Sequence, residues 1–210
     1  PVSLDWTAIR NGLSQRTILI TGAGGSIGSE LCRQIARLQP EKLVLFESSE
    51  YNLYAIELEL RKKFPELLLY AVLGDVRDPI ATNSAFQRFQ PSVVFHAAAY
   101  KHVPMLEHQV REAVRNNVLG TRIVADAANR HGCSEFVQIS TDKAVNPANI
   151  MGSTKRVAEI YCQNLNARSN TRFITVRFGN VLGSAGSVVP LFREQIAAGG
   201  PITVTHPEME

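Results

Sequence analysis

The sequence predicts an α/β fold in which helices cover both faces of a doubly wound parallel sheet. Short apolar runs alternate with helical patterns along the chain. Most of these runs are apolar on both faces, which is typical of strands buried inside a parallel sheet. A glycine-rich turn also joins the first run to the first long helix, as in open sheets built from right-handed crossovers.

Six runs are expected to be strands, and a seventh is a candidate. They are, in order, Thr17–Thr21, Lys42–Glu47, Leu68–Asp75, Ser92–Ala98, Glu135–Thr141 and Thr171–Gly179, with Ile202–Thr205 as the candidate. Helices are expected over Ser26–Leu38, Tyr51–Phe64 and Val110–Arg130. In the first helix, apolar residues recur at spacings of four, four and three, which indicates one buried stripe.

Composition excludes several classes of protein. Hydrophobic residues make up 45% and charged residues 20% of the 210 residues, and the formal net charge is only +3 with scattered basic residues, so no nucleic-acid partner is expected. The three cysteines lack metal-ligand spacing, which predicts buried thiols, no metal site and a reducing compartment. No apolar run reaches the ~20 residues of a membrane span.

The chain is expected to be part of a longer protein, because it lacks an initial Met and stops after a strand-like run. Residues 1–16 are interpreted as a polar lead-in whose single Trp packs on the domain surface. Residues 17–210 are interpreted as a dinucleotide-binding (Rossmann) domain with the beginning of a substrate-binding region.

The loop after the first strand has the form expected of a phosphate-binding turn. Gly22 permits the tight turn, Gly25 lets the backbone approach a pyrophosphate, and Gly28 lets the helix pack closely on the sheet. The helix begins at Ser26 and Ile27, whose end of the helix offers N–H groups and a positive dipole to phosphates.

Three further features indicate which dinucleotide binds. Glu47 lies 19 residues after Gly28, where a carboxylate accepts the ribose hydroxyls and repels a 2′-phosphate, so NAD is expected as the cofactor. Ser48 and Ser49 leave open an alternative in which they help to hold a phosphate. Asp75 and the following Val76 end the third strand, where an Asp either binds the adenine amino group or only caps a loop.

Small residues end the fourth strand. Ala97, Ala98 and Ala99 leave room for the cofactor backbone and ribose, and core packing is the alternative explanation.

With these motifs the sequence resembles the extended short-chain dehydrogenase/reductase family from residue 15 onward. The strings HAAAYKHVP (96–104), STDK (140–143) and RFGNV (177–181) resemble, more narrowly, the membrane-anchored nucleotide-sugar dehydratases of polysaccharide biosynthesis. The resemblance implies an NAD-dependent lyase that converts UDP-N-acetylglucosamine to a UDP-4-keto-6-deoxy sugar. It also implies an N-terminal membrane region absent from these residues, a parent protein at the cytoplasmic face of the bacterial inner membrane, and a homo-oligomer that pairs through its long helices.

The wider family has a Tyr followed four residues later by a Lys (YxxxK). In this sequence Met151 stands in place of the Tyr, and Lys155 is the Lys. Both side chains lie on one helix face, but a thioether has no proton to exchange. Either catalysis is lost or another group has taken the role, and the large dehydratases that resemble this chain share the Met, which favours the second. Lys155 is then expected to bond the nicotinamide ribose.

The catalytic groups are suggested by the resemblance and by the position of residues 141–143 at the end of the strand expected over Glu135–Thr141. Removal of water across C5 and C6 requires transient oxidation at C4, because a 4-ketone acidifies C5–H. Lys143 is assigned as the C5 base with a lowered pKa, and Asp142 as the acid for the C6 hydroxyl with a raised pKa and an apolar flank. Thr141 is assigned to the C4 oxygen, and water or Asp142 takes the C4 proton.

Substrate contacts are expected from five more residues, each with a structural alternative. Lys101 and His102 follow the alanines and face the sugar, or they lie in a solvated loop. Asn117 contacts substrate, or it holds a helix in place. Asn180 and Val181 contact the nucleotide half, or they form a plain strand-end turn.

Two rival functions remain open. One is a nucleotide-sugar epimerase or a C5-inverting dehydratase, which only product analysis separates. The other is a catalytically silent NAD-binding module that acts as a sensor or scaffold, for which Met151 is the best support.

Overall fold

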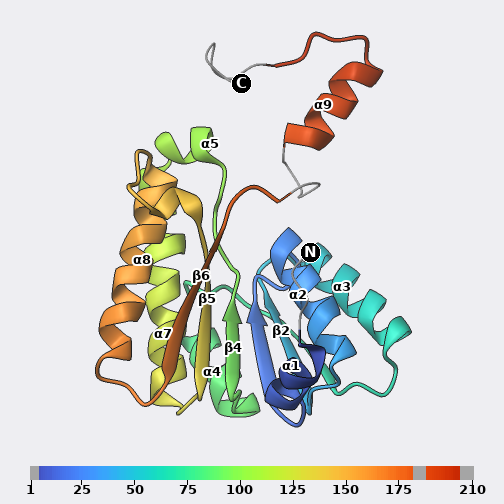
Figure 1. Ribbon diagram of the computed structural model, residues 1–210, viewed down its shortest axis with the longest axis vertical. Coiled ribbons are helices and arrows are strands. Elements are labelled where there is room, and N and C mark those ends of the chain that lie inside the picture. The colour runs from blue at the N-terminus through green and yellow to red at the C-terminus, as the bar shows by residue number, and fades with distance from the viewer. Residues whose placement is uncertain (1–4, 182–187, 204–210) are drawn as a thin grey trace. The chain divides into compact units, whose positions relative to one another are not determined.

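The computed structural model describes residues 5–181 and 188–203. Its centre is a six-stranded, all-parallel sheet in the order β3-β2-β1-β4-β5-β6, drawn in Figure 1. The strands are β1 (Thr17–Thr21), β2 (Lys42–Glu47), β3 (Leu69–Leu73), β4 (Val93–His96), β5 (Glu135–Thr141) and β6 (Arg172–Phe178). The order reverses between β1 and β4, and doubly wound sheets bind their ligands at this switch point.

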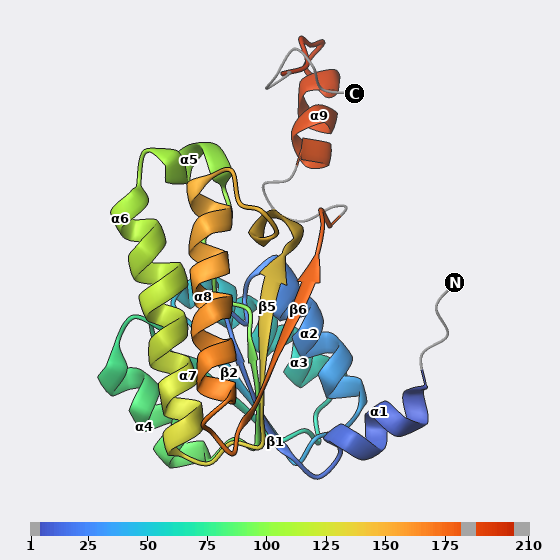
Figure 2. The same cartoon turned by 60° about the vertical axis from the view of Figure 1, so that its left-hand side comes forward.

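Helices form a layer on each face of the sheet, as Figures 1 and 2 show. One layer is α2 (Ser26–Arg37) and α3 (Glu50–Lys63), which close one apolar core over β1 and β2. The other is α4 (Pro79–Phe89), α7 (Thr121–Arg130) and α8 (Ile150–Asn166), which close the second. β1, β2 and β4 are buried along nearly their whole length, which explains why their sequences do not alternate between apolar and polar residues.

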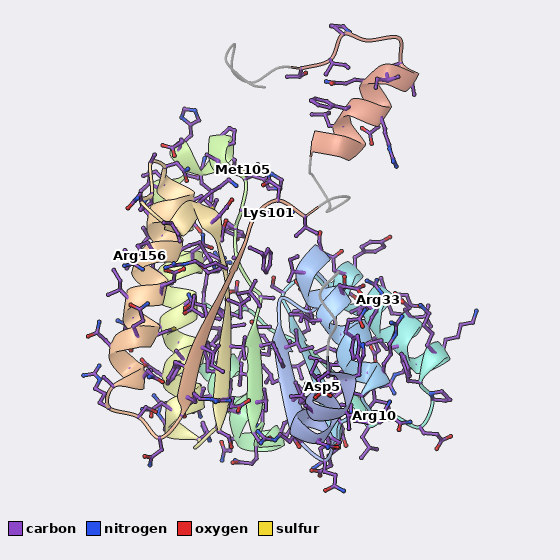
Figure 3. The ribbon with its side chains drawn as sticks, viewed as in Figure 1. Asp5, Arg10, Arg33, Lys101, Met105 and Arg156 are labelled. Carbon is purple, nitrogen blue, oxygen red and sulfur yellow. The ribbon has the colours of Figure 1, made fainter. Side chains whose placement is uncertain are left out.

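Shorter elements complete the first compact unit, which ends at Phe178. They are α1 (Trp6–Leu13), α5 (Val103–Glu107), α6 (Val110–Ala113), the π-helix η1 (Val114–Gly120) and the 3₁₀ turn η2 (Asp142–Ala144). Between α2 and α3, the guanidinium of Arg33 pairs with both carboxylate oxygens of Glu59 at 2.9 Å; Figure 3 labels Arg33.

Residues 179–210 form a second unit that contains α9 (Val188–Ala197). Ile202 and Thr203 are not in a strand, so that part of the candidate seventh strand was wrong, and the rest of it lies outside the described residues. Within the described ranges, no helix is both long and apolar enough to cross a membrane.

Most strand and helix bounds agree with the expectations to within a few residues, but the helix expected over Val110–Arg130 is divided. Its middle is the π-helix η1. Directly after η1, the Thr121 hydroxyl donates to the backbone carbonyl of Asn117 at 2.7 Å. Two consecutive residues of the π-helix, Asn116 and Asn117, are both buried. Apolar periodicity does not reveal such a change of helix type.

The lead-in is a helix rather than an irregular segment. Asp5 caps it by accepting the Ala8 N–H at 2.9 Å. Trp6 is 53% exposed, and its packing on the domain surface stays a prediction.

The turn between β1 and α2 requires glycine at two positions. Gly22 has φ +64°, and a Cβ there would lie 2.7 Å from the Ala98 backbone. A Cβ on Gly28 would lie 1.9 Å from the Gly22 carbonyl oxygen. Helix α2 therefore begins in direct backbone contact with the end of β1.

Gly28→Ala is expected to lower the free energy of unfolding by about 1–3 kcal/mol, because the backbone of Gly22 and Ala23 must move away from the new methyl. Urea unfolding measures the change. Gly12→Ala is the matched control, since nothing lies within 4 Å of its Cβ and the residue is inside α1. Equal stability of Gly28→Ala and the unsubstituted chain would contradict the inferred contact.

Candidate active site

A pocket of about 180 Å³ lies at the carboxyl-terminal ends of β1, β2, β3 and β4. Ligand pockets commonly measure ~300–1,000 Å³, so this one has room for part of a dinucleotide and not all of it. Its lining contains eight of the expected cofactor residues and six others. They are Gly22, Gly25, Glu47, Asp75, Val76, Ala97, Ala98 and Ala99, with Phe46, Ser48, Asn52, Gly74, Tyr100 and Asn116.

The N-terminus of α2 differs from those of α3, α4 and α8. Ser49, Asp78 and Asn149 cap α3, α4 and α8 with side-chain oxygens. Helix α2 has Gly25 at this position and, among the described residues, no side-chain cap. Ser26 and Ile27 are its first residues, so the first turn of α2 presents its N–H groups at the pocket edge, where an anion is stabilised.

Glu47 is anchored by three backbone N–H groups. Gly24 donates to one carboxylate oxygen at 3.0 Å, and Ser48 and Ser49 each donate to the other at 2.9 Å. The side chain is 8% exposed and lines the pocket. Because Glu47 already holds the backbone donors of Ser48 and Ser49, a phosphate bound by these residues would have to be held by their hydroxyls.

Asp75 lines the pocket but is already paired. The Arg77 guanidinium contacts both carboxylate oxygens, at 2.5–3.0 Å, and also reaches Glu112 of α6 at 3.2 Å. The bonds from Arg77 hold the pKa of Asp75 below its usual value. An adenine amino group would therefore share an ionised carboxylate whose orientation Arg77 fixes. Sequence reasoning missed Arg77, although it stands two residues from Asp75.

Asn117 bonds within the protein. It is fully buried, its oxygen accepts the Tyr100 N–H at 2.8 Å, and its NH₂ group donates to the Tyr100 carbonyl and the Thr154 hydroxyl at 3.0 Å. This geometry corrects the expected substrate contact and favours the positioning alternative. Its neighbour Asn116, which was not singled out, lines the pocket instead.

The groups that follow β5 form a short chain of polar contacts. The Thr141 hydroxyl donates to Asp142 at 2.9 Å, and the Lys143 ammonium lies 3.3 Å from the same oxygen. The Asp142 side chain is 57% exposed, and the bonds from Thr141 and Lys143 hold its pKa below the usual value. The expected apolar flank and raised pKa of Asp142 were therefore wrong.

Met151 is a core residue. It is 5% exposed and packs with Leu106, Ala113 and Val103 in a small apolar cluster beneath α5. Met151 was a candidate only by its position in the YxxxK pair, and its packing supports no acid/base role. The next residue, Gly152, holds η2 close to α8, because a Cβ there would lie 2.3 Å from the Lys143 carbonyl oxygen.

Lys155 is 5% exposed, and its ammonium donates to the Ile139 carbonyl at 2.6 Å. Burial lowers its pKa from 10.5 to about 8, against the opposing influence of Cys162 and Glu159. Lys155 does not line the pocket, so its bond to a nicotinamide ribose stays a prediction.

A buried carboxylate that sequence reasoning missed lies one helical turn beyond Lys155. Glu159 is fully buried and accepts bonds from Ser140 at 2.6 Å, from Arg177 at 2.8 and 2.5 Å, and from Arg156 at 3.1 Å. Burial opposes its ionisation, but these donors outweigh burial and hold its pKa below the usual value. The cluster ties β5, β6 and α8 together.

The remaining candidate substrate residues lie in loops. Lys101 and His102 are exposed, and Figure 3 shows Lys101 beyond the end of β4. Asn180 and Val181 are exposed residues of the second unit. The sugar and nucleotide contacts assigned to these four residues stay predictions.

The sheet order, the glycine turn and the pocket at the switch point define a Rossmann-type α/β protein. The chain belongs to the polysaccharide biosynthesis protein family, whose sequence profile matches residues 18–210.

Two relatives illustrate the family. The capsular polysaccharide biosynthesis protein CapD of Staphylococcus aureus is 52% identical over all of this chain, which spans 35% of that protein. An inverting UDP-N-acetylglucosamine 4,6-dehydratase of Campylobacter jejuni is 35% identical over 92% of this chain and 58% of its own length.

Solved structures agree with this grouping. Pen from Bacillus thuringiensis superposes with a TM-score of 0.88 at 36% identity, over 94% of this chain and 62% of that one. A dTDP-glucose 4,6-dehydratase of Streptomyces venezuelae with NAD bound has a TM-score of 0.76 at 20% identity, over 89% and 63% of the two chains. The second likeness shows the fold alone.

The buried Lys155 predicts a pH dependence of stability. Between pH 8 and 10.5 the unfolded chain holds a proton on this lysine that the folded chain has lost, so this group makes stability rise with pH across that window. The lowering from 10.5 to about 8 corresponds to at most about 3 kcal/mol.

Urea unfolding of the unsubstituted chain and of Lys155→Met between pH 7.5 and 10 measures this effect. The stability of the unsubstituted chain relative to the variant should rise across the range. The same comparison with Lys62→Met, at an exposed lysine of α3, should show no rise. If the difference in free energy of unfolding between the unsubstituted chain and Lys155→Met did not change with pH, Lys155 would be solvated.

Proposed function

We propose that this protein is an NAD-dependent nucleotide-sugar 4,6-dehydratase acting on UDP-N-acetylglucosamine. The observation that carries the proposal is the linked trio of Thr141, Asp142 and Lys143 at the end of β5, in the same sheet edge as the pocket. A relative named for the inverting form of this dehydration, at 35% identity, supports the reaction class.

The pocket fits an NAD molecule bound through its adenosine half. Because Gly22 has no Cβ, the turn can lie against the backbone of Ala98. The first turn of α2 would then hold the pyrophosphate of the cofactor. Glu47 keeps lone pairs for the ribose hydroxyls while its three N–H bonds hold it in place. Bound NAD would accept hydride from C4 of the sugar and return it to C6.

The ionised Asp142 is suited to two successive proton transfers. As a carboxylate it accepts the proton of the C4 hydroxyl, which leaves a C4 ketone. The resulting carboxylic acid then gives that proton to the C6 hydroxyl, which departs as water. The lowered pKa of Asp142 therefore suits the start of the cycle, when this residue must be a carboxylate, and no separate acid is required.

Lys143 completes the balance of protons. It removes the C5 proton that the C4 ketone has made acidic, and it returns that proton to C5 at the end. Thr141 holds the oxygen at C4 by a hydrogen bond. The sum of these steps is the loss of one water, with both side chains restored.

Met151 gives some support to a second function, a silent NAD-binding module, because it is packed in an apolar cluster where the wider family has an acid/base residue. A C5-inverting outcome of the same dehydration has support from the name of the Campylobacter relative. Product analysis separates these outcomes.

We also propose that subunits associate with one another and that the parent protein is associated with a membrane. Val110 and Val114, at the start of the helical segment before α7, and Val157 and Ile160 on α8 are 38–49% exposed, which suits pairing of these helices between subunits. The resemblance to membrane-anchored dehydratases supports a parent protein at the cytoplasmic face of the inner membrane.

Incubation of the purified protein with UDP-N-acetylglucosamine and NAD, followed by NMR of the sugar, tests the reaction. A C6 methyl doublet with a 4-keto centre is expected. Lys143→Ala should lower kcat by about 10²–10⁴-fold, the usual contribution of a positioned base, and leave NAD binding intact. Lys62→Ala, at an exposed lysine of α3, is the control. An unchanged sugar spectrum with NAD bound would favour the silent module.

Cofactor choice is tested separately at Glu47. Glu47→Gln removes the charge at nearly constant volume, so NAD should bind about tenfold more weakly and the preference for NAD over NADP should narrow. Titration calorimetry with both cofactors measures this, and the exposed Glu50→Gln is the control. An undiminished NAD preference would mean that Glu47 does not select the ribose.

A further inference from the structure

His96 lies at the end of β4 with no exposed surface. Its Nδ1 is 2.7 Å from the hydroxyl of Thr21, the residue beside it in β1, and its Nε2 is 2.9 Å from the hydroxyl of Thr121 in α7. Both ring nitrogens are therefore bonded inside the protein, and neither faces the pocket.

The direction of these bonds follows from the proton of Thr121. That hydroxyl lies 2.7 Å from the backbone carbonyl oxygen of Asn117. A carbonyl oxygen can only accept, so the single proton of the Thr121 hydroxyl is donated to it. Its oxygen must then accept from His96, which places the ring proton on Nε2. Nδ1 is left as an acceptor, and Thr21 donates to it.

The chain of bonds joins two walls of the pocket. At one end, Thr21 immediately precedes Gly22 of the phosphate-binding turn. At the other end, Asn117 holds both the N–H and the carbonyl of Tyr100. Gly22 and Tyr100 both line the pocket, from opposite sides of the switch between β1 and β4.

The surroundings keep the ring neutral. Burial, assisted by the positive charge of Lys155 in α8, lowers the pKa of His96 to about 3. On the β5 side, the Phe136 ring lies 5.7 Å away and Gln138 is the register partner, so β5 contributes no charged group there. A neutral ring can donate in one direction and accept in the other, which a charged ring cannot.

We propose that His96 is a positioning residue, held as the Nε2–H tautomer, that couples the phosphate-binding turn to the Tyr100 wall of the cofactor pocket. The coupling to NAD rests on the proposed function, whereas the tautomer and the bond direction rest on the geometry alone. His96 itself touches neither cofactor nor substrate.

The first test is the NMR spectrum of the ¹⁵N-labelled imidazole, with His96→Gln to assign the signal. A neutral Nε2–H ring that does not change between pH 6 and 8 is expected. An Nδ1–H ring, or one that gains a proton in this range, would overturn the bond direction and with it the proposal.

The second test is NAD affinity in Thr121→Val, which removes the hydroxyl that links His96 to Asn117 at nearly constant shape. A dissociation constant about tenfold higher is expected, because the two walls are no longer held in register. The matched control is Thr82→Val, a buried threonine of α4 whose hydroxyl has no hydrogen-bond partner among the described residues. Thermal unfolding of both variants shows whether each is folded.

The outcomes separate the two proposals. A folded Thr121→Val that binds NAD within twofold of the unsubstituted chain overturns the coupling and leaves the proposed function standing. An unsubstituted chain that does not bind NAD overturns the proposed cofactor, and the NMR result still decides the tautomer. If Thr121→Val does not fold, Thr21→Val gives the same test from the other end of the chain of bonds.

Discussion

The contact between the backbones at Gly22 and Gly28 is the constraint on which the site depends. The carbonyl of Gly22 occupies the space where a side chain at position 28 would begin. Helix α2 can therefore start directly at the end of β1, with its dipole aimed across the switch point. The same turn lies against Ala98 after β4, so the approach of β1, α2 and β4 shapes the pocket before any charged group is considered.

A second requirement is the satisfaction of polar groups between the sheet and the helices that follow it. His96, Lys155 and Glu159 are all buried, and each is bonded to a partner on another element. Loss of one partner from a buried ion pair costs about 3–5 kcal/mol, and an unsatisfied buried donor costs about 1–3 kcal/mol. These costs penalise shifts of α7 relative to β4, and of α8 and β6 relative to β5, so the strand ends that carry the candidate chemistry are held in place.

The sequence was sufficient for the fold because buried strands and a glycine turn are local patterns. The bounds of β1, β2 and β5 and most of the pocket lining follow from them. Most of the failures share another cause. The roles of Asn117, Met151 and Glu159 depend on which residues face them from distant elements, and no spacing along one chain encodes that. Arg77 is different, because its partner Asp75 is two residues away in the sequence. The ionisation of Asp142 was wrong for a different reason: its exposure follows from the fold, while its partners Thr141 and Lys143 are its immediate neighbours in the sequence.

Met151 and Asp142 are connected by the way α8 begins. Met151 points into the cluster under α5, where the Glu107 side chain also accepts the Ile150 N–H at 2.8 Å, so the first turn of α8 is fixed by apolar packing and by a cap from another helix. A thioether suits that dry position, whereas a hydroxyl would need a partner there. Proton chemistry must then come from groups in contact with water, and Asp142 and Lys143 are close by, because Gly152 lies against the carbonyl of Lys143. On the proposed function, replacement of the tyrosine by methionine moves the acid/base work from α8 to the turn after β5.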